Sequence, residues 1–195
     1  MQLSYLFTTL LAAFAVASPI STASDAAEGA QLATRATEEL TAEYRAAQRA
    51  ISNLQAGKFY WFTIEWDLGE VIPGPTHETP DELKQLQQQL GFDHIGLVVG
   101  QVTETKTGKG KNEKIKKDFK ASLLHMTKDT KKNTELKGPN YKADRKALIR
   151  GGETSKKKVD AAKKAAKDYV AANPVYSVAT NNCNTFVQTI KAVVR

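Results

Sequence analysis

Cysteine is almost absent from this sequence, since the 195 residues contain one, Cys183. A single cysteine cannot form an intramolecular disulfide, so the core must stabilise the fold without a crosslink. The chain also has no glycine-rich phosphate loop and no internal repeat, and its three histidines with one cysteine are a poor zinc ligand set. We therefore expect no metal and no cofactor, and Cys183 is either a buried inert side chain or a reactive thiol.

Long apolar runs are missing as well. The most apolar stretch, Met1 to Ala17, is shorter than the roughly 18 consecutive apolar residues that a membrane-spanning helix needs. A short apolar stretch followed by small residues is typical of a secretory signal peptide. We expect residues 1–23 to be a signal peptide, cleaved after Ala17 or near Ala23, and the remaining single domain of about 175 residues to be secreted.

Charge is divided unevenly between the two halves of the chain. Residues 25–100 carry 12 acidic and 5 basic side chains, whereas residues 101–195 carry 9 acidic and 23 basic ones. The Lys-rich region 103–167 suits an anionic membrane surface or an acidic partner, although Lys runs are more often only solvated surface. We expect no specific nucleic-acid partner.

Hydrophobic periodicity predicts two helices and a strand in the acidic half. Apolar residues recur at spacings of three and four from about residue 24 to 55, which predicts a long amphipathic helix within residues 24–57. The aromatic and β-branched run 59–66 predicts a strand. After a loop rich in proline and glycine, Thr79-Pro80 predicts the start of a second helix that ends at Gly91.

The basic half predicts a sheet followed by two helices. We expect buried strands at 94–102 and 121–126, joined by an exposed, mobile hairpin extension over 103–120. A helix capped by Thr154 or Ser155 and stopped at Asn173-Pro174 follows, then a strand at 175–178 and a last helix beginning at Cys183 after Asn181-Asn182. The expected fold class is α+β, an antiparallel sheet packed against helices, with the main domain at 58–195.

Two histidines stand where they could serve the thiol of Cys183. A thiol at a helix N-terminus has a lowered pKa because the helix dipole and unpaired N–H groups favour the thiolate. His94 begins a strand and could act as the base, and His125 would lie beside His94 if the two strands pair antiparallel. A small buried cysteine and satisfied core histidines are the alternative interpretation.

The segment Tyr176-Ser177-Val178-Ala179-Thr180-Asn181-Asn182-Cys183-Asn184-Thr185-Phe186-Val187 resembles the cysteine motif of the permuted papain-like (NlpC-type) thiol hydrolases. Residues 94–100 and Leu124-His125 are similar to the two histidine segments of the lecithin:retinol acyltransferase-like branch. The run 182–186 and the aromatic strand 59–66 are similar to the PPPDE peptidase branch. The resemblance covers roughly residues 59–195, and Ile95 and Asn184-Thr185 depart from the acyltransferase pattern.

The resemblance implies a circularly permuted papain-like fold and a secreted hydrolase or acyltransferase. Cys183 would attack an ester, thioester or amide carbonyl, His94 would be the base, and His125 would complete a triad in the acyltransferase branch but be an extra residue beside the PPPDE dyad. The competing hypothesis is a non-catalytic secreted effector or binding protein that uses its basic half to bind an acidic partner.

Overall fold

The computed structural model describes residues 37–144 and 146–195, so the expected signal peptide 1–23 and the expected helical residues 24–36 lie outside the described residues. The described part contains six strands and four α-helices, which confirms the α+β class. In chain order the elements are β1 (Thr37–Leu40), α2 (Ala42–Ala50), β2 (Phe59–Trp66), α3 (Pro80–Leu90), β3 (His94–Thr107), the short 3-10 helix η1 (Gly110–Asn112), β4 (Lys114–Lys128), β5 (Thr134–Lys137), β6 (Ile149–Thr154), α4 (Lys156–Ala172) and α5 (Cys183–Val194).

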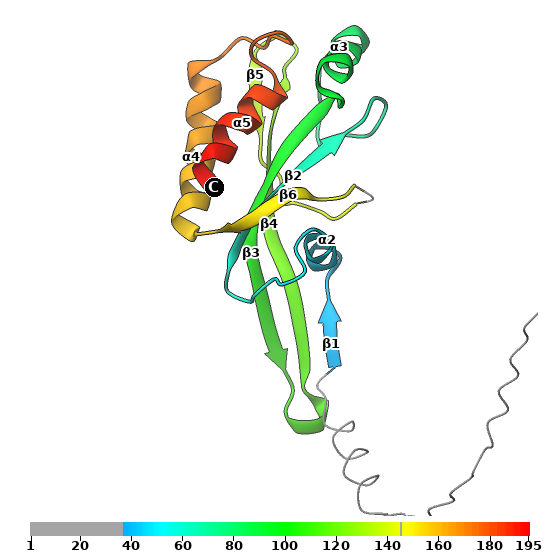
Figure 1. Ribbon diagram of the computed structural model, residues 1–195, viewed down its shortest axis with the longest axis vertical. Helices are drawn as coiled ribbons and strands as arrows, with labels where there is room; N and C mark the ends of the chain where they lie inside the picture. The colour runs from blue at the N-terminus through cyan, green and yellow to red at the C-terminus, as the bar shows by residue number, and fades with distance from the viewer. Residues whose placement is uncertain (1–36, 145) are drawn as a thin grey trace, which may run out of the picture. The chain divides into compact units, whose positions relative to one another are not determined.

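One sheet organises these elements (Figure 1). Its strand order is β1-β4-β3-β2-β6, and β5 pairs with the last residues of β4. All neighbours run antiparallel, as expected, except the short β1, which lies parallel to β4. The β3–β4 ladder runs from Leu97 opposite Leu124 to Thr107 opposite Lys114.

Side chains on alternate positions of β3 enter two separate cores, because successive residues of a strand point to opposite faces. Ile95, Leu97 and Val99 join the core formed with α3, α4 and α5, which we call the α5 core. Val98 and Val102 join the core formed with α2, which we call the α2 core. The helices α4 and α5 lie side by side on the sheet (Figure 1).

The prediction of a long helix within residues 24–57 is wrong for much of the described range 37–57. The helix covers only Ala42–Ala50, and Thr37–Leu40 is a strand paired with β4. The hydroxyl of Thr41 separates the two elements: it accepts a hydrogen bond from the Tyr44 N–H and donates one to Asp118 Oδ1. The periodicity nevertheless identified core residues, since Ile51 and Leu54 pack partly buried against the α2 core without being helical.

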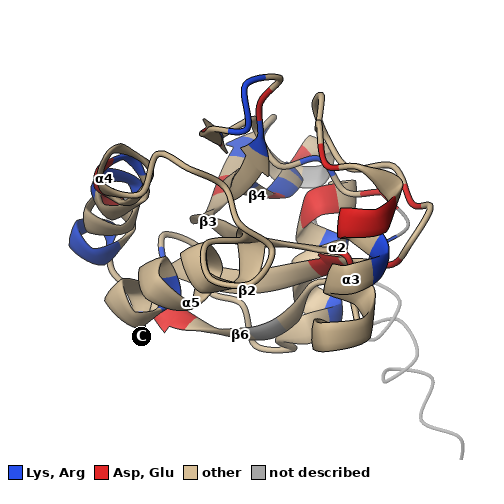
Figure 2. Cartoon of the chain, turned by 90° about the horizontal axis from the view of Figure 1, so that it is seen from above, with Lys and Arg blue, Asp and Glu red and all other residues tan. Residues whose placement is uncertain are grey.

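The expected hairpin over 103–120 is present, and its strands stay paired to its tip. Acidic residues of β1 and basic residues of β4 form ion pairs there: Lys117 with Glu38 at 2.5 Å and Lys116 with Glu39 at 3.4 Å. Figure 2 shows further lysines along α4. Exposed pairs of this kind contribute little, about 0–1 kcal/mol each, so the ladder itself must hold the hairpin.

Two further predictions have opposite outcomes. The helix expected after Thr79 is confirmed as α3, with a capping box between Thr79 and Glu82 and Gly91 in the left-handed conformation at its end. The strand expected at 175–178 is wrong, because Val175 and Ser177 make only isolated bridges and the chain turns back so that the Asn181 N–H bonds the Ser177 carbonyl.

No helix in the described ranges is long and apolar enough to cross a membrane.

Candidate functional site

The start of α5 is held by Asn182, which caps the helix as the sequence predicted. Its Oδ1 accepts hydrogen bonds from the N–H groups of Asn184 and Thr185 at 3.0 and 3.1 Å. Its Nδ2 donates to the Val178 carbonyl at 2.7 Å, which fixes the preceding turn to the helix. Cys183 is therefore the first residue of a well-capped helix.

The thiol of Cys183 contacts the backbone on both sides of His94. Its Sγ lies 3.9 Å from the carbonyl oxygen of Asp93, and the Ile95 N–H donates to it. The side chain of Cys183 is fully buried. The start of α5 and the start of β3 thus meet at this point.

The two histidines form a hydrogen-bonded pair, which confirms that pairing of the two strands brings them together. His94 Nε2 lies 2.9 Å from His125 Nδ1, and both side chains are buried. The Trp66 ring packs against them, with centroid distances of 5.4 Å to His94 and 6.4 Å to His125. The β3–β4 ladder ends at Leu97 and Leu124, and β4 pairs with β5 from His125 onward, so both histidines lie just beyond the end of that ladder.

The imidazoles and the thiol do not form a hydrogen-bonded dyad in the described part of the chain. His94 stands opposite Trp66 in the β2–β3 register and so shares the face of Trp66, which belongs to the α2 core. Cys183 belongs to the α5 core on the other face. The thiol therefore reaches His94 through its neighbouring peptide groups and not through its ring.

Burial controls the charge state of the site. Burial, together with the Glu78 and Asp93 carboxylates, raises the pKa of the Cys183 thiol to about 12, while the Ile95 and Asn184 N–H groups oppose the rise. Burial also lowers the pKa of His94 well below its usual value and, with Lys137, lowers that of His125 to about 4. The lowered thiol pKa expected from the helix start is thus wrong for this conformation, in which the thiol and both imidazoles are neutral at pH 7.

Polar atoms without a hydrogen-bond partner gather around this point. Buried unpaired polar atoms are rare in folded proteins and mark places where water, substrate or function is involved. Among the described residues, Trp66 Nε1, Asp93 Oδ1 and His125 Nε2 belong to side chains at the thiol or the histidine pair, and the Tyr176 hydroxyl faces the Glu78 carboxylate. This concentration favours a functional site over a plain apolar core.

Glu78 and Tyr176 were missed by the sequence argument. Glu78 is held by the Lys128 N–H, which donates to Oε1 at 3.2 Å, and Lys128 Nζ pairs with Glu82. The phenol of Tyr176 lies near both Glu78 and Cys183, and burial with these acidic neighbours raises its pKa well above 10. Tyr176 belongs to the cysteine motif and could have been singled out, whereas no spacing in the sequence connects Glu78 with Cys183.

Replacing Glu78 by Gln is expected to lower the pKa of the Cys183 thiol by about 1, since a nearby carboxylate disfavours the thiolate. The pH dependence of Cys183 alkylation by iodoacetamide measures this change. Asp81→Asn, an exposed change at the start of α3, is the control and should leave the thiol pKa as it is. An unchanged or higher pKa in Glu78→Gln would show that the carboxylate does not act on the thiol.

Comparisons with known proteins add no family assignment: no family model, no curated protein and no solved structure matches the chain. Within residues 37–144 and 146–195, no group of three histidine, cysteine or acidic side chains is arranged to hold a metal ion. The candidate site therefore rests on its own geometry.

Proposed function

We propose that the protein is a secreted thiol-dependent hydrolase or acyltransferase with a circularly permuted papain-like fold, in which Cys183 is the nucleophile and His94 the base. The observation that carries the proposal is the contact of the helix-start thiol with the backbone on both sides of His94, whose ring is bonded to His125. The order of histidine before cysteine in the chain supports the permuted arrangement. The unpaired polar atoms around the site support a reactive role.

The chemistry follows from the groups present. The Cys183 thiol gives its proton to His94 Nδ1, and the sulfur attacks the carbonyl carbon of an ester, thioester or amide. The carbonyl oxygen takes the electron pair and is stabilised by the Cys183 N–H and a neighbouring donor. Collapse expels the leaving group, which takes the proton from His94, and water or another acceptor then releases the acyl group and restores the thiol.

The histidine pair suits this role in one tautomer. If His94 Nε2–H donates to His125 Nδ1, the Nδ1 atom of His94 keeps its lone pair for the thiol proton. His125 then carries its own proton on Nε2, the atom without a partner. His125 is thus a positioning residue that fixes the tautomer of the base.

The described conformation is a closed one. The thiol is buried and protonated, and its proton transfer requires Sγ and the His94 ring to approach hydrogen-bond distance. Because the ring shares the face of Trp66 and the thiol belongs to the α5 core on the other face, the start of β3 that carries His94 must rearrange for this approach. Because Glu78 and Tyr176 lie beside the thiol, we expect the segments that carry them to move when substrate enters.

The direct test compares the wild-type protein with Cys183→Ala on a panel of 4-nitrophenyl esters. Loss of the nucleophile is expected to reduce turnover to the background rate, since covalent catalysis has no substitute for the sulfur. The fold of the variant is checked by circular dichroism. Wild-type rates retained by Cys183→Ala would exclude this cysteine as the nucleophile.

The second candidate function is a secreted binding protein that does no chemistry. It is favoured by the burial and high pKa of the thiol, which a purely structural cysteine would also have. Its binding surface would be the Lys-rich region 103–167, and binding to anionic vesicles would then weaken steeply with salt. A protein that binds such vesicles but shows no reaction dependent on Cys183 would support this candidate.

A further inference from the structure

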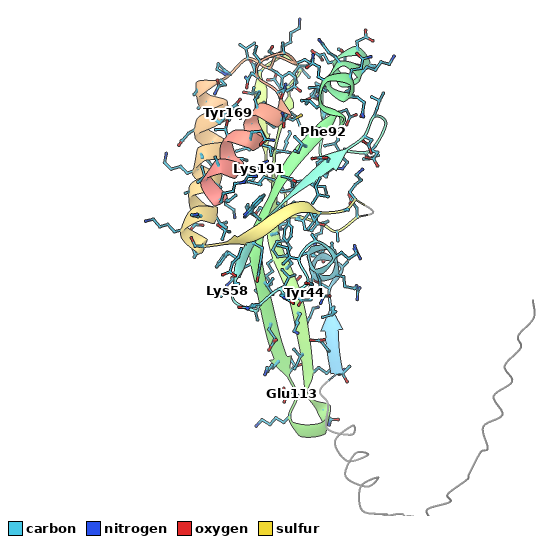
Figure 3. The ribbon with its side chains drawn as sticks, in the orientation of Figure 1. Tyr44, Lys58, Phe92, Glu113, Tyr169 and Lys191 are labelled. Atoms are coloured by element: carbon cyan, nitrogen blue, oxygen red, sulfur yellow. The ribbon has the colours of Figure 1, made fainter. Side chains whose placement is uncertain are left out.

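A cavity of about 250 Å³ lies between α5, the strands β2 and β3 and the end of α3. Its wall includes Asn184 and Ile95, the residues that directly follow Cys183 and His94 in the chain. Figure 3 labels Phe92, just before β3, and Lys191 on α5, two more of the residues that line it. The cavity therefore lies on the α5 face of the sheet and adjoins Cys183 through Asn184, while neither Cys183 nor His94 lines it.

The lining of this cavity is mainly polar. Five of its nine lining residues carry polar side chains: Thr63, Glu65, Asn184, Gln188 and Lys191. Lys191 is only 5% exposed, so a charged group forms part of a nearly buried wall. A hydrocarbon chain placed here would remove the side-chain amides of Asn184 and Gln188 from water without offering hydrogen bonds, which is costly.

Two amide side chains give the cavity its recognition pattern. Gln188 Nε2 donates a hydrogen bond to Asn184 Oδ1 at 3.0 Å. This bond leaves Asn184 Nδ2 as a donor and Gln188 Oε1 as an acceptor, on a half-buried and an exposed side chain respectively. A neighbouring donor and acceptor complement the C=O and N–H of a peptide-type amide.

We propose that this cavity binds an amide group in the acyl part of the substrate and that Asn184 and Gln188 determine this specificity. The inference rests on the proposed function for its link to catalysis, because the substrate amide would bind at Asn184, the residue that follows the nucleophile Cys183. The preferred substrate is then an acyl group that carries a peptide-type amide near its reacting carbonyl. A plain hydrocarbon acyl chain of equal length is the disfavoured substrate.

The binding arm of the test uses N-acetylglycinamide and needs no turnover. In nitrogen-15 NMR spectra the side-chain NH₂ signals of Asn184 and Gln188 should shift saturably. Gln188→Leu should weaken binding about tenfold, the loss expected for one hydrogen bond, and Thr189→Ala on the next exposed position of α5 should not. Absence of these shifts, or equal affinity in Gln188→Leu, would overturn the inference.

The turnover arm compares the 4-nitrophenyl esters of N-acetylglycine and pentanoic acid, which have acyl groups of equal length. After division by each ester's spontaneous hydrolysis rate, the amide-bearing ester should be preferred about tenfold, and Gln188→Leu should abolish the preference. Cys183-dependent turnover without this preference would remove the specificity role and leave the proposed function standing. Binding of N-acetylglycinamide without any Cys183-dependent turnover would instead refute the proposed function and leave the cavity site standing.

Discussion

Replacing His94 by Ala is expected to lower kcat/KM by about 10²–10⁴-fold, the contribution ascribed to acid and base catalysis. The substitution removes the group that accepts the thiol proton and later returns it to the leaving group. His125→Asn should reduce activity less, because an amide can still bond the His94 ring. Steady-state kinetics on one ester, measured well below the thermal unfolding temperature of each variant, gives both values.

Measuring the stability of each variant together with its activity distinguishes a catalytic role of the histidines from a structural one. Loss of either ring leaves the other with a buried unpaired nitrogen, which costs about 1–3 kcal/mol whether or not the site is catalytic. Near-full activity of His94→Ala on a substrate that Cys183→Ala cannot process would rule out His94 as the base. If His125→Ala loses stability but no activity, a Cys-His dyad without a third residue is favoured.

Phe186→Ala is expected to destabilise the protein by about 3–5 kcal/mol. Phe186 is fully buried in the α5 core and meets Tyr169 of α4 edge to face, with ring centroids 5.5 Å apart. Its loss leaves a cavity under the first turn of α5, where Cys183 is held, so activity should fall together with stability. Urea unfolding monitored by circular dichroism measures the change.

Val193→Ala provides the comparison for this prediction. Val193 lies on the same helix but is only partly buried against the same core, so its truncation should cost clearly less than that of Phe186. Equal costs for the two substitutions would mean that Phe186 does not anchor α5 to the sheet as its burial indicates.

Local signals in the sequence were sufficient to predict where the helices α3 and α5 begin. The cap at Asn182 and the capping box at Thr79 depend on side chains that bond N–H groups two or three residues away, so their start points were predictable. The strand β1 was not predictable in this way. Thr37–Leu40 lies in a stretch of helix-forming composition and becomes a strand only because it pairs with β4, more than 70 residues away.

The lowered pKa expected for the Cys183 thiol was wrong because the sequence does not show how deeply the thiol is buried. A helix N-terminus stabilises a charge by about 0.3–1 kcal/mol in exposed positions and up to about 2 kcal/mol in partly buried ones. Full burial shifts a pKa by as much as about 3–5, equivalent to several kcal/mol, and therefore outweighs the dipole. That burial depends on α5 packing against the sheet, and the charge of the Glu78 carboxylate, which is distant from Cys183 in the sequence, adds to the rise in pKa.

The central claim is that Cys183 carries the acyl group during the reaction, and intact-protein mass spectrometry tests it most directly. After incubation with the 4-nitrophenyl ester of N-acetylglycine and rapid acid quench, we predict a single acyl adduct at Cys183. Hydroxylamine should remove it, as expected for a thioester, and Cys183→Ala should not form it. Ester turnover by the wild-type protein without any adduct at Cys183, or with equal labelling of Cys183→Ala on its lysines, would contradict the account.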